Sequence, residues 1–146
     1  MVYLISACLL GLPCRYDGRV REVSPAVERL AKEHTLIPVC PEVLGGLPTP
    51  RPPAERQGER IVNAEGVDVT AAYRRGAEEV LRLCRHHGAD GVILKDMSPS
   101  CGTNGIYDGS FTRTRVPGLG VTAELLLSAG VTVLDEGGAP PPRKEK

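Results

Sequence analysis

Residues 2–7 read VYLISA, an apolar run without alternation that has the length of a β-strand. Three similar runs follow along the chain: LIPV at 36–39, GVILK at 91–95 and VTVL at 131–134. Strands that are buried on both faces lack alternation, which is typical of a parallel sheet. The four runs therefore predict a mainly parallel sheet of about four strands.

Helical patterns lie between these runs. Ser24 followed by Pro25 predicts a helix start, because serine caps helix N-termini and proline is favoured at the first helical position. Two further helices are predicted from the apolar spacing: one from Asp68 or Thr70 to a stop at Gly88, and one from about Thr122 to Ala129.

The alternation of strands and helices predicts a single α/β domain over residues 1–136, with three layers (α/β/α) in a Rossmann-like or flavodoxin-like arrangement. Glycine and proline gather in 41–58 and 98–120, which predicts long functional loops after the second and third strands. The proline-rich, charged tail at 137–146 is predicted to be disordered. Ligands of such sheets bind beyond the carboxyl ends of the strands, so we expect the chemistry there.

Composition excludes several classes of protein. Lys plus Arg and Asp plus Glu number 18 each, and a chain with zero net charge lacks the basic footprint of a protein that binds nucleic acid duplexes. No apolar run reaches the roughly 18 residues that span a membrane, and the N-terminus lacks the basic start of a secretory signal. Five cysteines are too sparse for a disulfide scaffold. We therefore expect a cytoplasmic protein with free, metal-bound or catalytic thiols.

Three of the cysteines follow predicted strands. Cys8 and Cys40 come directly after the first and second strands, and Cys101 comes six residues after the third. If the first strand lies between the other two, the three sulfurs can converge on one crevice at the sheet edge. The alternative is that they are small buried residues, which is how we interpret Cys84 on the apolar stripe of its helix. Glycine or proline beside the other three weakens that alternative.

Three thiolates suggest a metal centre that keeps one open position. The chain has no C-x-x-C pair and no paired histidines of the spacing that a structural zinc site uses. An iron–sulfur cluster is normally held by four cysteines, so three would leave one iron open. Cys14, in the same loop as Cys8, could be a fourth ligand, a gate to the site or a separate reactive thiol.

Polar residues surround these cysteines. Glu42 lies two residues beyond Cys40, where a carboxylate is a candidate general base. Ser98 and Ser100 precede Cys101, and their hydroxyls could bond a reacting group. Three basic residues could neutralise thiolates or bind an acidic substrate: Arg15, Arg51 and Lys95.

Five stretches together resemble a known family, and they occur in this order: SACLLGLPCRYDG, PVCPEVLGGLPTPRPPAE, GVDVT, LKDMSPSCGTNGIYDGSF and GLGVTAELL. The family is that of domain of unknown function 523, and the resemblance runs from about residue 3 to residue 136. Some of its members are TudS-like thiouracil desulfidases. The resemblance implies an enzyme of sulfur metabolism that converts 2-thiouracil, or a similar thioamide, to uracil and sulfide without net redox change.

The resemblance also implies a 4Fe-4S cluster held by three cysteines. Carried onto this chain, the metal ligands are Cys8, Cys40 and Cys101, with Cys14 as the alternative ligand from the first loop. The catalytic acid and serine of the family fall on Glu42 and Ser98.

The substrate is expected to be a thiolated pyrimidine base, with contacts from the loops that surround the cysteines. The expected contact residues are Cys14, Arg15, Tyr16, Ser100 and Tyr107, of which the two tyrosines are candidates for stacking on the base. Two other functions remain open from the residues alone. One is a non-catalytic module that binds a metal or cluster, and the other is a metal-free enzyme with Cys14 or Cys101 as nucleophile, activated by Arg15 or a helix N-terminus.

Overall fold

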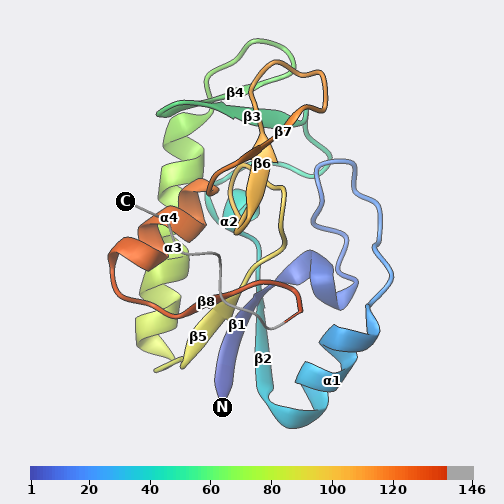
Figure 1. Ribbon diagram of the computed structural model, residues 1–146, viewed down its shortest axis with the longest axis vertical. Helices are drawn as coiled ribbons and strands as arrows, with labels where there is room; N and C mark the ends of the chain where they lie inside the picture. The colour runs from blue at the N-terminus through green and yellow to red at the C-terminus, as the bar shows by residue number, and fades with distance from the viewer. Residues whose placement is uncertain (138–146) are drawn as a thin grey trace.

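The computed structural model describes residues 1–137 of the 146-residue chain. Its central sheet has four parallel strands in the order β2-β1-β5-β8 (Figure 1). The strands are β1 (Val2–Ser6), β2 (Thr35–Val39), β5 (Gly91–Ile93) and β8 (Val133–Leu134). The prediction of a mainly parallel sheet of about four strands is confirmed.

Three of the strands, β1, β5 and β8, are shorter than the apolar runs that predicted them. β5 ends at Ile93, whereas the run continues to residue 95. The backbone N–H of Lys95 donates at 3.0 Å to the side-chain hydroxyl of Ser6, the last residue of β1, and not to a backbone carbonyl of the sheet. The chain therefore leaves the sheet at this point and enters the loop that carries Cys101.

The three predicted helices are present. They are α1 (Pro25–Glu33), α3 (Thr70–His86) and α4 (Val121–Ser128). The Ser24 hydroxyl accepts a hydrogen bond from the Val27 N–H at 3.2 Å, so Ser24 is the predicted N-cap. Gly88, just beyond α3, has a φ of 58°, a left-handed conformation that suits glycine at a helix end.

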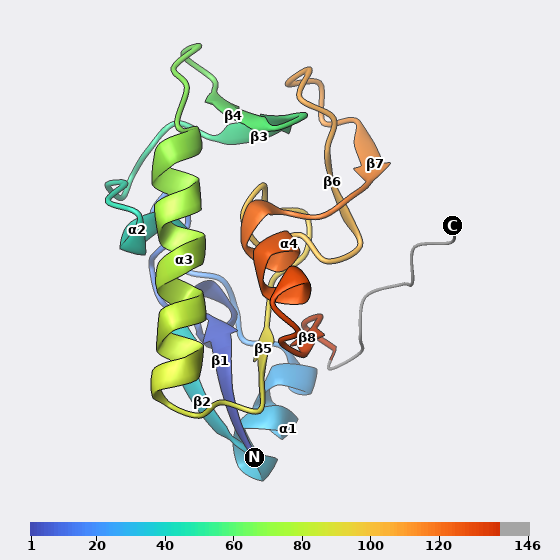
Figure 2. The same ribbon diagram turned by 90° about the vertical axis from the view of Figure 1, so that its left-hand side faces the viewer.

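The helices cover both faces of the sheet (Figures 1 and 2). On one face Leu4 and Val92 pack with residues of α3 and α4, including Val80 and Leu126. On the other face the strand residues Tyr3, Ile5 and Ile93 pack against Val27 of α1 and Leu9 of the first loop. The sheet is thus buried on both sides, which explains its continuous apolar runs and confirms the three-layer α/β/α prediction.

The two long segments rich in glycine and proline are more ordered than expected. Residues 41–58 contain α2 (Pro41–Leu44) and β3 (Ala54–Gln57), which pairs with β4 (Arg60–Asn63). Residues 98–120 contain β6 (Gly105–Tyr107) paired with β7 (Arg115–Pro117). These short strands are largely polar or partly exposed, so no continuous apolar run marks them in the sequence.

These additions stand at one end of the molecule. Figure 1 places both β-ribbons above the carboxyl ends of the central strands, and Figure 2 shows the same arrangement from the side. The first loop begins as the short 3-10 helix η1 (Ala7–Leu10). The long segments therefore form a cover over the edge where chemistry was expected.

The sequence also predicted a disordered C-terminal tail and no membrane-spanning segment. Of the predicted disordered tail at 137–146, only Gly137 belongs to the described residues, and the rest lies outside them. Within residues 1–137 the longest helices are too short or too polar to cross a bilayer.

Candidate active site

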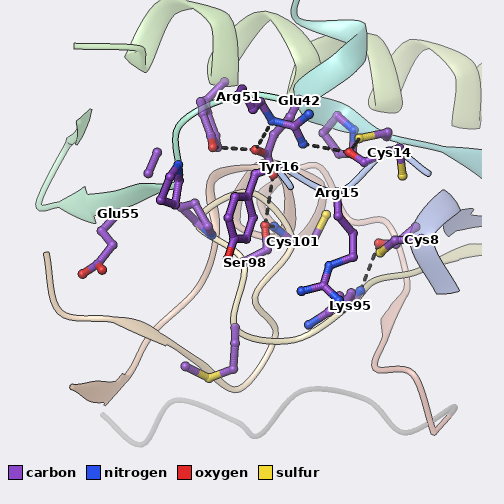
Figure 3. A pocket seen from close by; sticks show the side chains of 18 of the residues that line it. Cys8, Cys14, Arg15, Tyr16, Glu42, Arg51, Glu55, Lys95, Ser98 and Cys101 are labelled. Carbon is purple, nitrogen blue, oxygen red and sulfur yellow. Dashed lines mark hydrogen bonds and ion pairs between the residues drawn. The ribbon is translucent and has the colours of Figure 1, made fainter. Parts of the chain in front are cut away.

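A pocket of about 470 Å³ opens at the carboxyl end of the sheet (Figure 3). Its lining includes Ser6 and Val39, the last residues of β1 and β2, and it extends to Ala54 of β3 and Tyr107 of β6. The volume falls in the range of ligand sites, which are typically about 300–1,000 Å³. The pocket therefore lies where the fold predicts a ligand site, under the two β-ribbons.

Three strand ends deliver cysteines to this pocket. Cys8 lies in η1 after β1, Cys40 lies between β2 and α2, and Cys101 lies in the loop after β5. β1 stands between β2 and β5, which is the strand order that the convergence of the three sulfurs requires. Cys14 also lines the pocket, whereas Cys84 is 4% exposed and belongs to the core, as predicted.

The cysteine side chains interact with one another. A hydrogen bond from the Cys14 thiol lowers the pKa of Cys40 to about 6, against the opposing effect of burial. The same thiol lowers the pKa of Cys8, while its bonds to Cys40 and Cys8 raise its own pKa well above the ordinary range. Burial raises the pKa of Cys101 to about 12. The Cys14 thiol therefore lies between the thiols of Cys8 and Cys40 and hydrogen-bonds both of them.

The loop that carries Ser98 and Cys101 folds around one carboxylate. Asp96 Oδ1 accepts hydrogen bonds of 2.9–3.2 Å from four backbone N–H groups, those of residues 97, 103, 104 and 105. Within the loop the Ser98 hydroxyl oxygen accepts from the N–H groups of Ser100 and Cys101, at 3.0 and 3.2 Å. These bonds fix the direction of the Ser98 side chain.

Ser98 faces Glu42 across the pocket. Its hydroxyl donates to Glu42 Oε2 at 3.5 Å, and the dashed lines of Figure 3 mark this bond and the ion pair of Glu42 with Arg51. Glu42 lies in the first turn of α2, two residues after Cys40, and its side chain is 16% exposed. The two predicted catalytic residues therefore meet, although 56 positions separate them in the chain.

Most of the other predicted site residues line the same pocket. These are Arg15, Tyr16, Arg51, Lys95 and Tyr107. Ser100 differs: it is fully buried, its hydroxyl pairs with that of Thr122 at 2.8 Å, and it is not part of the lining. The expected substrate contact from Ser100 is thus not provided by this geometry, because its side chain joins the loop to α4.

The structure adds lining residues that sequence reasoning did not select. Tyr73 of α3 was not among the predicted site residues, yet it lines the pocket and its hydroxyl donates to Glu42 Oε1 at 2.7 Å. Ser6 was predicted only as part of a strand, yet its hydroxyl hydrogen-bonds the Cys101 side chain and accepts the Lys95 N–H. Its place at the carboxyl end of the first strand is a signal that could have identified it. For Tyr73 no local pattern exists, because its role depends on how α3 packs.

The donor set fits a cluster better than a single ion. Within residues 1–137 no three His, Cys, Asp or Glu side chains surround one metal-ion position. The cysteines that hold an iron–sulfur cluster bind different irons and so do not converge on one point. Three soft sulfur donors from separate strand ends, lining one pocket, match that requirement.

Comparison with known proteins agrees with this geometry. Residues 3–137 match the model of a family described as 2-thiouracil desulfurase. A solved structure of a [4Fe-4S]-dependent thiouracil desulfidase, TudS, superimposes with a TM-score of 0.86 at 50% identity, covering 92% of this chain and 89% of that one. The uncharacterized protein YbbK of Bacillus subtilis (strain 168) is 43% identical over 143 residues, which cover 91% of this chain and 94% of YbbK.

These matches cover nearly the whole described chain and confirm the resemblance that the five sequence stretches carry. The match to TudS shows a fold of the same class over 92% of this chain. The chain belongs to the 2-thiouracil desulfurase family.

Proposed function

We propose that the protein is a [4Fe-4S]-dependent thiouracil desulfidase that converts 2-thiouracil to uracil and sulfide. The observation that carries the proposal is a single pocket lined by three strand-end cysteines and by the Glu42–Ser98 pair. A module that only binds a cluster has no need of a carboxylate and a hydroxyl aimed at each other beside the thiols.

Cys8, Cys40 and Cys101 are the proposed cluster ligands. Each follows one of three adjacent parallel strands, so the backbone that holds it is anchored in the sheet. Cys14 comes from the middle of the first loop, and its thiol bonds both Cys8 and Cys40. We therefore assign Cys14 to the surroundings of the site and Cys8 to the cluster.

When it is bound, the cluster supplies Lewis acidity toward the soft thione sulfur of the substrate. Glu42 then acts as the general base: it takes a proton from the water whose oxygen bonds to C2 of the ring. Ser98, 3.5 Å from Glu42 Oε2, holds that water or the ring in line with the carboxylate. The hydroxyl of the C2 adduct then loses its proton as the C2=O bond forms, and the C–S bond breaks with its electron pair on sulfur. Sulfur leaves as hydrogen sulfide with both protons of the water, one of them returned by Glu42, and uracil is released.

Substrate contacts are proposed for the pocket residues that face the cysteines. Tyr16 and Tyr107 supply aromatic faces for a pyrimidine ring. Arg15 and Cys14 border the same space and supply polar contacts. A thiolated pyrimidine base is thus the proposed substrate. Five free cysteines in residues 1–137 agree with a reducing compartment, and we propose that the protein works in the cytoplasm.

The test is Glu42→Gln, prepared without oxygen. The variant is expected to keep the iron and sulfide content of the wild type and to lose at least about 100-fold in the rate of uracil formation, since general bases contribute that much. Glu28→Gln, at an exposed position of α1, is the matched control and is expected to react at the wild-type rate. If Glu42→Gln releases sulfide as fast as this control, Glu42 is not the base.

A further inference from the structure

The two carboxylate oxygens of Glu42 have different surroundings. Oε1 accepts the Tyr73 hydroxyl at 2.7 Å and the Arg51 Nε–H at 3.1 Å. Oε2 faces the Ser98 hydroxyl at 3.5 Å, a longer and weaker contact. One oxygen is therefore bound firmly by two donors, and the other faces the reacting side of the pocket.

Tyr73 is built to remain a donor. It lies on α3 and is 2% exposed, so its ring is fixed by the surrounding core. Burial, reinforced by the negative charge of Glu42, raises the pKa of Tyr73 far above its ordinary value. The phenol therefore stays protonated, and its O–H points at the carboxylate.

Arg51 is held just as firmly. Its side chain is 5% exposed, and its guanidinium makes four bonds: to Glu42 Oε1, to the Pro48 carbonyl, to the Thr49 hydroxyl and to the Cys14 carbonyl. A planar guanidinium with several fixed partners cannot rotate freely. The position of Glu42 is thus tied to the first loop as well as to α3.

We infer that Tyr73 and Arg51 are positioning residues for Glu42, which hold Oε1 so that Oε2 is the oxygen that takes the proton from the attacking water. The inference rests on the proposed role of Glu42 as the base. In the reaction a water O–H bond breaks, its proton goes to Oε2, and the electron pair of the oxygen forms the new bond to carbon. Neither Tyr73 nor Arg51 exchanges a proton in this step.

This arrangement has a kinetic consequence. A carboxylate with only one donor on Oε1 can rotate about its last bond, and small misplacements of a catalytic group cost up to about 100-fold in rate. We expect Tyr73→Phe, which keeps the buried ring and removes the hydroxyl, to lower kcat about tenfold with KM changed less than about twofold. The iron and sulfide content is expected to stay at the wild-type level, because Tyr73 is not one of the proposed ligands.

The matched control is Tyr3→Phe. Tyr3 is also buried, at 9% exposed, but it packs on the opposite face of the sheet and its hydroxyl donates to the Met1 sulfur at 3.1 Å. Removal of the Tyr3 hydroxyl is expected to leave kcat and KM unchanged. Equal kcat values for Tyr73→Phe and Tyr3→Phe would overturn the inference, as would a rise in KM or a loss of iron in Tyr73→Phe with kcat preserved.

A double variant tests whether Tyr73 acts through Glu42. Glu42→Asp keeps a carboxylate but shortens the side chain, so that it no longer reaches Tyr73. In that background Tyr73→Phe is expected to change kcat less than about twofold, because residues that act as a unit are not additive. A full tenfold loss in both backgrounds would show that Tyr73 acts independently of Glu42 and would contradict the inference.

Arg51→Lys is the second variant. Lysine keeps the charge but cannot bond Glu42, Thr49 and the Cys14 carbonyl together, so kcat is expected to fall at least as much as in Tyr73→Phe. A wild-type kcat in Arg51→Lys would remove Arg51 from the positioning pair. The outcomes also separate the two proposals. If Glu42→Gln reacts at the wild-type rate, Glu42 is not the general base and has no need of positioning residues. If Glu42→Gln is inactive but Tyr73→Phe is fully active, Glu42 remains the base and only the positioning role of Tyr73 is overturned.

Discussion

At the scale of single residues, the site depends on which hydrogen-bond partners each hydroxyl and carboxylate has. Ser98 illustrates this, because its oxygen accepts two backbone N–H bonds while its proton faces Glu42. The Ser98 hydroxyl therefore both stabilises the loop and faces the proposed general base. A substitution that removes the hydroxyl affects both, and the two can be measured separately.

Ser98→Ala is expected to lower kcat by about 100-fold, since a group that holds the reacting water or ring contributes to proton transfer. It is also expected to lower the free energy of unfolding by about 1–3 kcal/mol, because the N–H groups of Ser100 and Cys101 lose their acceptor. Steady-state rates and urea unfolding measure the two effects. Ser128→Ala, an exposed hydroxyl on α4, is the control. A rate equal to that of the control would remove Ser98 from the chemistry.

At the scale of elements, the placement of Glu42 depends on the close crossing of α2 and α3. Gly45 and Gly76 meet there, and a Cβ on either would clash with backbone of the other helix. At Gly76 the clash would be with the Pro41 carbonyl oxygen, one residue before Glu42. The two glycines thus let α3 approach closely enough for Tyr73 to reach the carboxylate.

Gly76→Ala is therefore expected to push α2 away from α3. Overpacking of this kind costs about 1–3 kcal/mol in the free energy of unfolding, although alanine is the better helix former. The same shift separates Tyr73 from Glu42, so kcat is expected to fall too. Urea unfolding and rate measurements test this, with Glu78→Ala on the exposed side of α3 as the control. An unchanged or higher stability in Gly76→Ala would contradict the close packing.

The loop around Asp96 gives a prediction about pH. Burial raises the pKa of Asp96, but the four backbone hydrogen bonds together outweigh it, and the net pKa is lowered. A lowered folded-state pKa stabilises the protein above the unfolded value of about 3.9, and this contribution is lost as the pH falls through the folded-state pKa. The stability difference between wild type and Asp96→Asn is expected to be constant near neutral pH and to shrink in acid.

Urea unfolding at a series of pH values measures this difference. Asparagine keeps one acceptor oxygen but carries no charge, so the comparison isolates the ionised form of the side chain. A difference that is the same at every pH, or that grows in acid, would show that the charge of Asp96 does not stabilise the loop.

The elements that sequence patterns revealed are those marked by a buried apolar run or by a helix signal. The run at 2–7 and the Ser24–Pro25 signal identified β1 and α1 because burial on two faces and a helix cap leave local marks. The same reasoning placed Cys8, Cys40 and Cys101 at one edge, since parallel strands end together. The ribbons β3–β4 and β6–β7 were missed because their strands are partly exposed and lack the continuous apolar runs that revealed β5 and β8. Tyr73 was missed because its contact depends on helix packing across 31 positions.

At the scale of the whole molecule, the proposed cluster joins segments that are far apart in the chain. Cys8, Cys40 and Cys101 belong to three different connections, and the pocket that they line extends to β3 and β6. A group that binds all three stabilises the folded state, because the unfolded chain does not hold the same site. Stability and cluster content should therefore change together.

Removal of iron by a chelator without oxygen is expected to lower Tm by several degrees. The cluster-free wild type and the Cys8→Ala variant are then expected to melt within about 2 °C of each other, since neither has the bound group. Thermal melts followed by circular dichroism measure both. If the loaded and cluster-free proteins melt at the same temperature, the group does not bridge the three connections.

The most direct test of the account counts iron and acid-labile sulfide per chain in anaerobically purified wild type and in each of the five Cys→Ala variants. The account predicts four irons per chain in the wild type, as in the [4Fe-4S] desulfidase that this structure matches, and the same in Cys14→Ala and Cys84→Ala. It predicts a clear loss in Cys8→Ala, Cys40→Ala and Cys101→Ala. A full complement of iron in any of these three, or its loss in Cys84→Ala, would contradict the proposed centre.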